Sequence, residues 1–229
     1  MMLLAADTST TQVTVSVGDA ERLWGGMVLA RRRHHAELLV PALDHLLTAL
    51  DIRIADVTGV AVTTGPGLFA GLRVGIATMA GVAQVGELPM YGLSSLEVLA
   101  DAAPVIDGTI AATIDARRGE LYWARFARLD GRLVRLSADA VDPPATVARA
   151  AVNDVVVGHG VDVSQRAETG SHRAGRQLDT GLTPEALWRV SVRAAQTSSG
   201  VSAQEIEPVY LRKTDAELNW ERRRSLEPT

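Results

Sequence analysis

Two aspartates are the residues in this sequence whose type and position best suit phosphate or metal chemistry. Asp7 follows a short apolar run and precedes the hydroxyl residues Thr8 and Ser9, and Asp115 ends a second apolar run. A kinase needs aspartate carboxylates for Mg²⁺ together with complete phosphate and adenosine loops. An aspartate at the end of a strand can also simply form a turn by bonding its own backbone. The sequence leaves both interpretations of Asp7 open.

A glycine turn is the second feature that suits an anion. Gly65-Pro66-Gly67 follows an apolar run and precedes a segment with helical spacing. Glycine permits backbone angles that other residues resist, and proline fixes one of them. A strand, a sharp turn and a helix in succession direct the first N–H groups of the helix at a ligand, often an anion. The candidate vestigial nucleotide or phosphate loops are therefore Asp7, Thr8, Ser9, Gly65, Gly67 and Asp115.

The histidines do not have the spacing of a metal site. His34 and His35 are adjacent and would point in different directions on a helix. His34 and His45 would share a helix face, but a rise of about 1.5 Å per residue separates them by roughly 16 Å. One metal ion with bonds of about 2 Å cannot bridge that distance. The chain also lacks cysteine, which excludes disulfides, cysteine metal sites and cysteine nucleophiles.

Two predicted helices carry stripes that suggest a docking surface. The first helix follows His35, has leucines on one broad face, and either starts near Pro41 or is kinked there. The second helix has a stripe of small residues that includes Gly71 and Gly75. Glycine inside a helix costs about 1 kcal/mol relative to alanine, so this stripe requires a packing reason. It packs either on the chain's own sheet or against another helix. We expect the partner interface to comprise Leu38, Leu39, Leu43, Leu46, Leu72, Gly75, Ile76, Met79 and Ala83. Gly75→Leu should then block partner binding while leaving the monomer folded.

The order of the predicted elements indicates an α/β protein with two lobes. Residues 1–104 predict three antiparallel strands followed by helices that alternate with strands, a βββαβα order. Residues 105–212 restart this order with a strand that ends in Asp115, which indicates an internal duplication with a reduced second lobe. We expect a surface loop at 164–181 and a charged tail at 213–229. The βββαβα order resembles that of the actin-like (ASKHA, ribonuclease H-like) fold.

Four segments, in this order along the chain, resemble the bacterial TsaB (YeaZ) family. They are residues 34–47 (HHAELLVPALDHLL), 65–75 (GPGLFAGLRVG), 115–122 (DARRGELY) and 208–212 (PVYLR). The family signature for the second segment is GPGSFTGLRIG, so Leu68 and Ala70 stand where the family usually has serine and threonine. Both differences remove hydroxyl groups, which weakens the idea that this loop handles phosphate by itself.

The resemblance implies a non-catalytic subunit of the machinery that makes threonylcarbamoyladenosine next to the anticodon of tRNA. Members of the family pair with the catalytic subunit TsaD, which uses ATP and a metal, and a small ATPase, TsaE, joins them. This chain alone would bind no cofactor, and tRNA would be engaged through the complex. The alternatives are an ASKHA-type ATPase or metallopeptidase active by itself, and a scaffold that forms homodimers through the same helices.

Composition predicts a cytoplasmic protein that does not bind nucleic acid on its own. The 229 residues carry a net charge of −4 with a pI near 5.7, whereas autonomous nucleic-acid binders usually have a basic face. The N-terminus is too short in apolar length, and too quickly polar, for a signal peptide or a membrane span. The length is sufficient for two lobes with an ample core.

Overall fold

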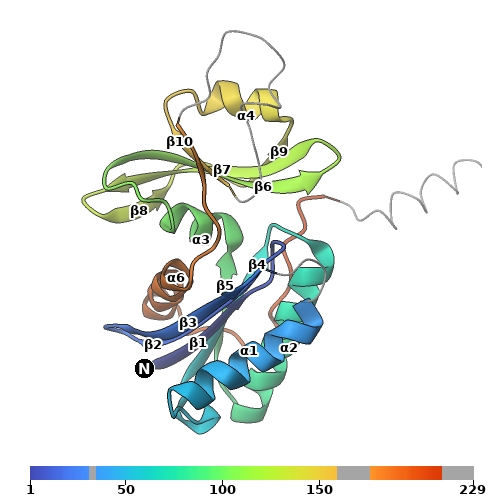
Figure 1. Cartoon of the computed structure of the whole chain (residues 1–229), viewed down its shortest axis with the longest axis vertical. Helices are drawn as coiled ribbons and strands as arrows, with labels where there is room; N and C mark the ends of the chain where they lie inside the picture. The colour runs from blue at the N-terminus through green and yellow to red at the C-terminus, as the bar shows by residue number, and fades with distance from the viewer. Residues whose placement is uncertain (31–34, 159–175, 213–229) are drawn as a thin grey trace, which may run out of the picture.

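The computed structural model describes residues 1–30, 35–158 and 176–212, which form two lobes, each built on one β-sheet (Figure 1). The lobes are stacked along the long axis of the molecule. Three features considered in the sequence lie outside the described residues. They are His34, most of the predicted loop at 164–181, and the tail at 213–229.

The first sheet has the strand order β3-β2-β1-β4-β5. Its strands are β1 (Met2–Asp7), β2 (Val13–Asp19), β3 (Leu23–Leu29), β4 (Gly59–Gly65) and β5 (Met90–Ser94). β1, β2 and β3 are antiparallel neighbours, whereas β4 runs parallel to β1 and β5 runs parallel to β4. Parallel neighbours require crossover connections. α1 (His35–Ala49) and the short 3-10 helix η1 (Ile54–Asp56) precede β4, and α2 (Phe69–Gly86) links β4 to β5.

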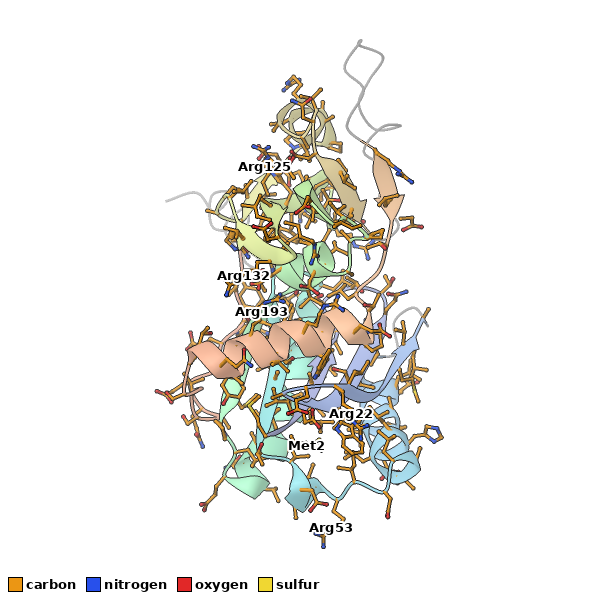
Figure 2. All side chains as sticks on the ribbon, turned by 90° about the vertical axis from the view of Figure 1, so that its left-hand side faces the viewer. Met2, Arg22, Arg53, Arg125, Arg132 and Arg193 are labelled. Atoms are coloured by element: carbon orange, nitrogen blue, oxygen red, sulfur yellow. The ribbon has the colours of Figure 1, made fainter. Side chains whose placement is uncertain are left out.

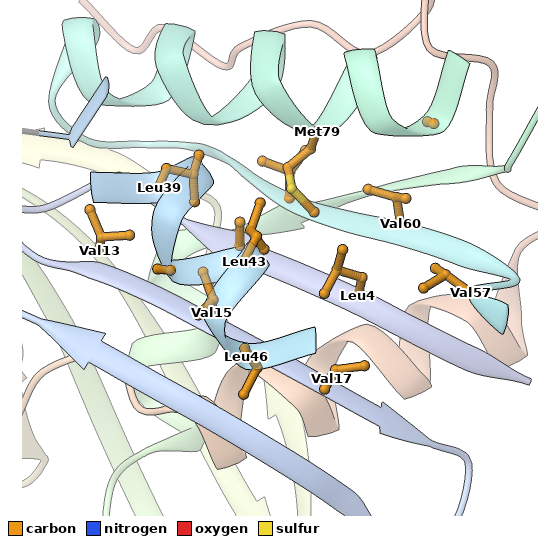
Figure 3. Close-up of a cluster of buried hydrophobic side chains, with 14 of the residues drawn as sticks. Leu4, Val13, Val15, Val17, Leu39, Leu43, Leu46, Val57, Val60 and Met79 are labelled. Carbon is orange, nitrogen blue, oxygen red and sulfur yellow. The ribbon is translucent and has the colours of Figure 1, made fainter. Parts of the chain in front are cut away.

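Helices cover both faces of the first sheet. α1 and α2 lie side by side on one face, and α6 (Pro184–Thr197) lies across the other (Figures 1 and 2). The alternation along β2 directs its valines toward α1, where they pack with leucines of that helix and with Met79 of α2 (Figure 3). Complete burial of one such side chain contributes about 1.5–3 kcal/mol. One part of the core of the first lobe therefore lies between the sheet and the α1–α2 pair, and a second part lies between the sheet and α6.

The second sheet repeats the topology of the first. Its elements are β6 (Gly108–Arg117), β7 (Glu120–Leu129), β8 (Arg132–Arg135), β9 (Ala140–Asp142), α4 (Pro144–Ala150), β10 (Val155–Gly158) and β11 (Gln177–Asp179). The order β8-β7-β6-β10-β11 has the same strand directions as β3-β2-β1-β4-β5, and β9 adds to β7. The predicted two-lobed, actin-like α/β fold is therefore confirmed.

Two short strands, β9 and β11, were missed by the sequence analysis. β11 lies within the segment 164–181, for which the sequence predicted only a surface loop. Val156 and Val157 of β10 are fully buried, and the Val156 N–H donates to the Arg176 carbonyl oxygen at 3.0 Å. β11 thus extends the sheet beside a buried strand, although its three residues carry little strand signal of their own.

The chain returns to the first lobe after β11, whereas the sequence assigned all of 105–212 to the second lobe. α6 buries Ala186, Leu187 and Val190 in a cluster with Leu3 and Ala5 of β1. The apolar face of an amphipathic helix requires a partner, and the first sheet has a face that α1 and α2 do not cover. α3 (Ser95–Asp101) lies between the lobes, where it packs against β6 and contacts α6.

Candidate functional site

Asp7 lies at the end of the central strand of the first sheet and is fully buried. Both of its carboxylate oxygens accept hydrogen bonds from Ser9, Oδ1 from the backbone N–H at 3.2 Å and Oδ2 from the hydroxyl at 2.8 Å. Burial raises the pKa of Asp7, and the hydroxyl groups of Thr63 and Ser9 and the charge of His35 offset only part of this rise. The hydrogen bonds from Ser9 thus keep the Asp7 carboxyl group inside the β1–β2 turn.

The N-terminal part of α2 closes over this turn. The Thr8 hydroxyl donates to the Gly71 carbonyl oxygen at 2.7 Å, and the Leu68 N–H donates to the Ser9 carbonyl oxygen at 2.7 Å. A Cβ atom at Gly71 would collide with the Thr8 carbonyl oxygen, and one at Gly75 would collide with the Thr8 hydroxyl. The stripe of small residues therefore admits the chain's own β1–β2 turn.

The glycine turn is packed in the same way. Gly65 has a φ of 127°, which favours glycine, and a Cβ atom at Gly67 would collide with the Ser9 carbonyl oxygen. Backbone N–H groups at a helix start can hold a phosphate only when they are free. Here the Leu68 N–H is already bonded to Ser9. The glycine turn thus packs directly against the β1–β2 turn, and one N–H group at the start of α2 is used in that contact.

Asp115 lies in the second lobe, near the end of β6, and no described contact joins it to the β1–β2 turn or the glycine turn. It accepts a hydrogen bond from the Arg117 N–H at 2.8 Å, and its other oxygen lies 3.5 Å from the Arg117 guanidinium. The structure therefore brings five of the six predicted loop residues together and leaves Asp115 in a hairpin of its own.

No metal centre is formed within the described part of the chain, where no three histidine, cysteine, aspartate or glutamate side chains gather. The Nε2 atom of His35 lies 2.7 Å from the Thr10 carbonyl oxygen, at the start of α1. His45 is exposed on α1. His35 therefore attaches the start of α1 to the β1–β2 turn, and His45 is a surface residue.

The side chains predicted to form the partner interface face the chain's own core. Leu38 is half-buried, and the other eight positions are buried. Several of them belong to the cluster between the helices and the first sheet that Figure 3 shows. The expectation that Gly75→Leu leaves the monomer folded is therefore wrong, because the space beside Gly75 holds the Thr8 hydroxyl. A partner that docks on this helix pair would meet other residues of α1 and α2.

The exposed positions of the helix pair include a group of apolar, mostly small residues, beside polar ones such as Asp44, His45 and Gln84. We define the outer helix face as the exposed positions Val40, Pro41, Ala70, Ala77, Gly81 and Val85. Val85 is 86% exposed, and nothing lies within 4 Å of the position that a Cβ atom at Gly81 would take. Arg73 is the one charged residue in α2. The sequence contained this signal, because Arg73, Thr78 and Gln84 are the only polar side chains among the 18 residues of α2, too few for a continuous polar face.

The same composition makes α2 long and apolar enough to cross a membrane. In the structure α2 packs on β4 and beside α1, with Leu72 and Met79 fully buried. It is therefore a core helix of the first lobe.

Residues 208–212, here called the strap, bring the motif segments together. The Val209 N–H donates to the Thr64 carbonyl oxygen at 2.7 Å, immediately before the glycine turn. Arg212 reaches Glu120 of the β6–β7 hairpin at 2.6 Å. The sequence analysis used these residues only as a motif. Nothing local in the sequence indicated a contact between segments that are 92 or more residues apart.

Comparison with known proteins agrees with this geometry. The family model described as "TsaD: tRNA N6-adenosine threonylcarbamoyltransferase" matches residues 25–220. The tRNA threonylcarbamoyladenosine biosynthesis protein TsaB of Haemophilus influenzae is 30% identical over 97% of each chain. TsaB of Escherichia coli is 37% identical over an alignment that covers 56% of each chain. The structure of YeaZ from Pseudomonas aeruginosa is 29% identical, with a TM-score of 0.81, and the match covers 92% of this chain and 99% of that one.

The fold and the site together define a two-lobed, actin-like protein in which the β1–β2 turn packs against the start of α2. The chain belongs to the TsaB (YeaZ) family, as the extent of the family match and the full-length relative show.

Proposed function

We propose that this chain is a non-catalytic subunit of a complex that makes threonylcarbamoyladenosine in tRNA. The observation that supports the proposal is the contrast between a tightly packed β1–β2 turn and an uncovered group of apolar residues on the helix pair. Atoms of Thr8 and Ser9 pack against glycines of the glycine turn and of α2, whereas the outer helix face carries apolar residues that no described part of the chain covers. Exposed apolar patches on soluble proteins commonly mark sites where partners bind.

The partner that fits this surface is the catalytic subunit TsaD, with the small ATPase TsaE joining the complex. In this proposal ATP and a metal belong to the partner, and this chain binds neither by itself. Glycine and alanine on α2 allow the backbone of a partner helix to approach closely. tRNA is engaged through the complex, in keeping with the net charge of −4. The site of action is the cytoplasm.

Two other functions use the same observations differently. An ATPase or metallopeptidase active by itself would require an open phosphate turn or three metal ligands, and neither is found among the described residues. A homodimer in isolation is compatible with the proposal, because the outer helix face would be available to a second copy until the catalytic partner replaces it.

The decisive experiment is threonylcarbamoylation of unmodified tRNA by the purified catalytic subunit, with and without this chain, while ATP hydrolysis is followed in parallel. The proposal expects modification only when both proteins are present, and no ATP turnover by this chain alone. ATP turnover by this chain alone would instead show that the chain is an ATPase active by itself. Modification that proceeds equally well without this chain would also contradict the proposal.

The docking surface is tested by Ala77→Arg, which places a charge in the exposed centre of the outer helix face. Burying an unpaired arginine should weaken binding to the catalytic subunit by at least about tenfold, or roughly 1.4 kcal/mol. Val152→Arg is a matched control, because Val152 is also exposed but lies in the second lobe. Isothermal titration calorimetry and melting temperatures for both variants would separate lost binding from lost folding. Equal affinities for the two variants would exclude this face.

A further inference from the structure

The strap is attached to the first lobe at the point where α2 begins. Besides the bond from Val209 to Thr64, the Val209 carbonyl oxygen lies 2.8 Å from the position that a Cβ atom at Gly65 would take. The glycine at position 65 is thus needed both for its φ and for the close approach of the strap. A side chain there would displace either the turn or the strap.

An aromatic contact extends this attachment into α2. The ring of Tyr210 lies 4.8 Å from the ring of Phe69, at an interplanar angle of 31°. Arg73 lies over Phe69 at 3.9 Å, and its Nε donates to the Tyr210 hydroxyl at 3.1 Å. Aromatic pairs and cation–π contacts of this kind each contribute specific geometry in addition to buried area. Tyr210 therefore fixes the first turn of the helix that carries most of the outer helix face.

The other end of the strap is attached to the second lobe. Arg212 donates to the Glu120 carboxylate at 2.6 Å and to the Ala116 carbonyl oxygen at 3.3 Å. The Arg212 side chain is 19% exposed, so this ion pair is better shielded than a surface pair. The ion pair joins the strap to the β6–β7 hairpin. In this hairpin Arg117 and Arg118 both have positive φ angles, of 65° and 55°. Strained residues of this kind persist only where the surroundings hold them.

We propose that the strap is a positioning element that sets the start of α2, and with it the outer helix face, against the second lobe. Tyr210 and Arg212 are the two positioning residues, one for each lobe. This inference rests on the proposed function, because the surface being positioned is the one assigned to the catalytic partner. A partner that contacts both lobes would then meet a single rigid surface, which lowers the conformational cost of binding.

The test compares variants at the two ends of the strap in the full-length chain. Arg212→Ala removes the second-lobe anchor, and the double variant Arg212→Glu with Glu120→Arg restores an ion pair of reversed polarity. Tyr210→Phe keeps the ring but removes the hydroxyl that Arg73 bonds, whereas Tyr210→Ala removes both contacts. Arg149→Ala is the matched control, because Arg149 is an exposed arginine of α4 that contacts only Thr146 in the same helix among the described residues.

Amide hydrogen exchange of the isolated chain is the first measurement. Arg212→Ala should speed exchange at residues 72–75, whose N–H groups make the first hydrogen bonds of α2, although Arg212 is attached to the other lobe. Exchange in β1 and β10 should remain unchanged, and the charge-reversed double variant should restore protection. Unchanged exchange at 72–75 in Arg212→Ala would overturn the coupling between the lobes.

Affinity for the catalytic subunit TsaD is the second measurement. Arg212→Ala and Tyr210→Ala should each weaken binding by about fivefold, with Tyr210→Phe intermediate and Arg149→Ala unchanged. Restored binding in the double variant would support positioning, because a merely structural defect would not follow the pairing of charges. Faster exchange with unchanged affinity would overturn the positioning role. A wild-type chain that does not bind the subunit would overturn the proposed function, and the exchange measurement would still decide whether the strap couples the lobes.

Discussion

The β1–β2 turn and the β6–β7 turn occupy equivalent positions in the two lobes, yet they are stabilised in different ways. Asp7 is fully buried, and α2 closes over its turn through Gly71 and Gly75. Asp115 is half-buried and bonds the N–H of Arg117 in its own hairpin. Aspartate at the same place in the topology is thus a buried hydrogen-bond acceptor in the first lobe. In the second lobe it stabilises a partly exposed hairpin turn.

The difference shows that a duplicated topology does not duplicate a site. In the first lobe, two glycines allow a helix backbone to touch the turn, so the turn and the helix pack directly on each other. In the second lobe the hairpin has an arginine pair in the left-handed region, which costs a residue other than glycine about 1–2 kcal/mol each, and Arg212 of the strap bonds its backbone. What each turn does is decided by the segment packed against it.

The largest change in stability is expected for a substitution at Gly71, where α2 contacts the β1–β2 turn. Gly71→Ala places a Cβ atom against the Thr8 carbonyl oxygen of a buried turn, so the free energy of unfolding should fall by about 2–3 kcal/mol. Gly81→Ala in the same helix is the control, and it should raise stability by about 0.5–1 kcal/mol because its Cβ atom meets nothing. Chemical denaturation of both variants measures the difference. Two equally mild effects would mean that α2 does not clamp the turn.

The two aspartates provide a direct comparison of the turns. Asp7→Ala leaves the buried N–H and hydroxyl of Ser9 without acceptors and should cost about 2 kcal/mol. Asp115→Ala loses one bond in a partly solvated hairpin, and should cost about 0.5–1 kcal/mol. Urea denaturation at neutral pH would rank the two variants. A larger loss for Asp115→Ala would reverse the assignment of buried and surface roles.

The smallest effect is a pH dependence that belongs to the first turn. Burial raises the pKa of Asp7 above its ordinary value of 3.8, so the folded state holds this proton to higher pH than the unfolded state does. The stability due to Asp7 is therefore complete below pH 3.8 and is lost as pH rises through the folded pKa. Asp7→Asn, which cannot ionise, should gain stability relative to the wild type over that interval. Parallel stability curves for the two proteins from pH 3.5 to 7 would contradict the raised pKa.

The sequence predicted the fold well because its signals are local. Apolar runs that end in Asp7 and Asp115 marked the two starting strands, and the glycine turn marked the junction of β4 and α2. The repeat of this order was enough to predict two lobes. β11 was not predicted, because three residues in a polar segment show little periodicity. They form a strand because they pair with β10.

The candidate site was predicted only in part. The sequence placed the interface on α1 and α2, and the stripes that it chose there are ones that the structure buries. α2 has no polar face, so periodicity could identify its stripes without saying which one faces the sheet. The contact of Gly71 and Gly75 with Thr8 decides the matter, and that contact joins segments more than 60 residues apart.

The sequence by itself thus determined the elements, their order, the two-lobed class and the family motifs, because each depends on residues that are neighbours along the chain. The tertiary structure alone decided that α2 packs on the β1–β2 turn, that α6 returns to the first lobe and that the strap connects Thr64 to Glu120. The Thr14 hydroxyl, for example, donates to the Leu182 carbonyl oxygen at 3.0 Å. Contacts across such separations depend on which faces remain uncovered once the sheets have formed, and no local pattern encodes that.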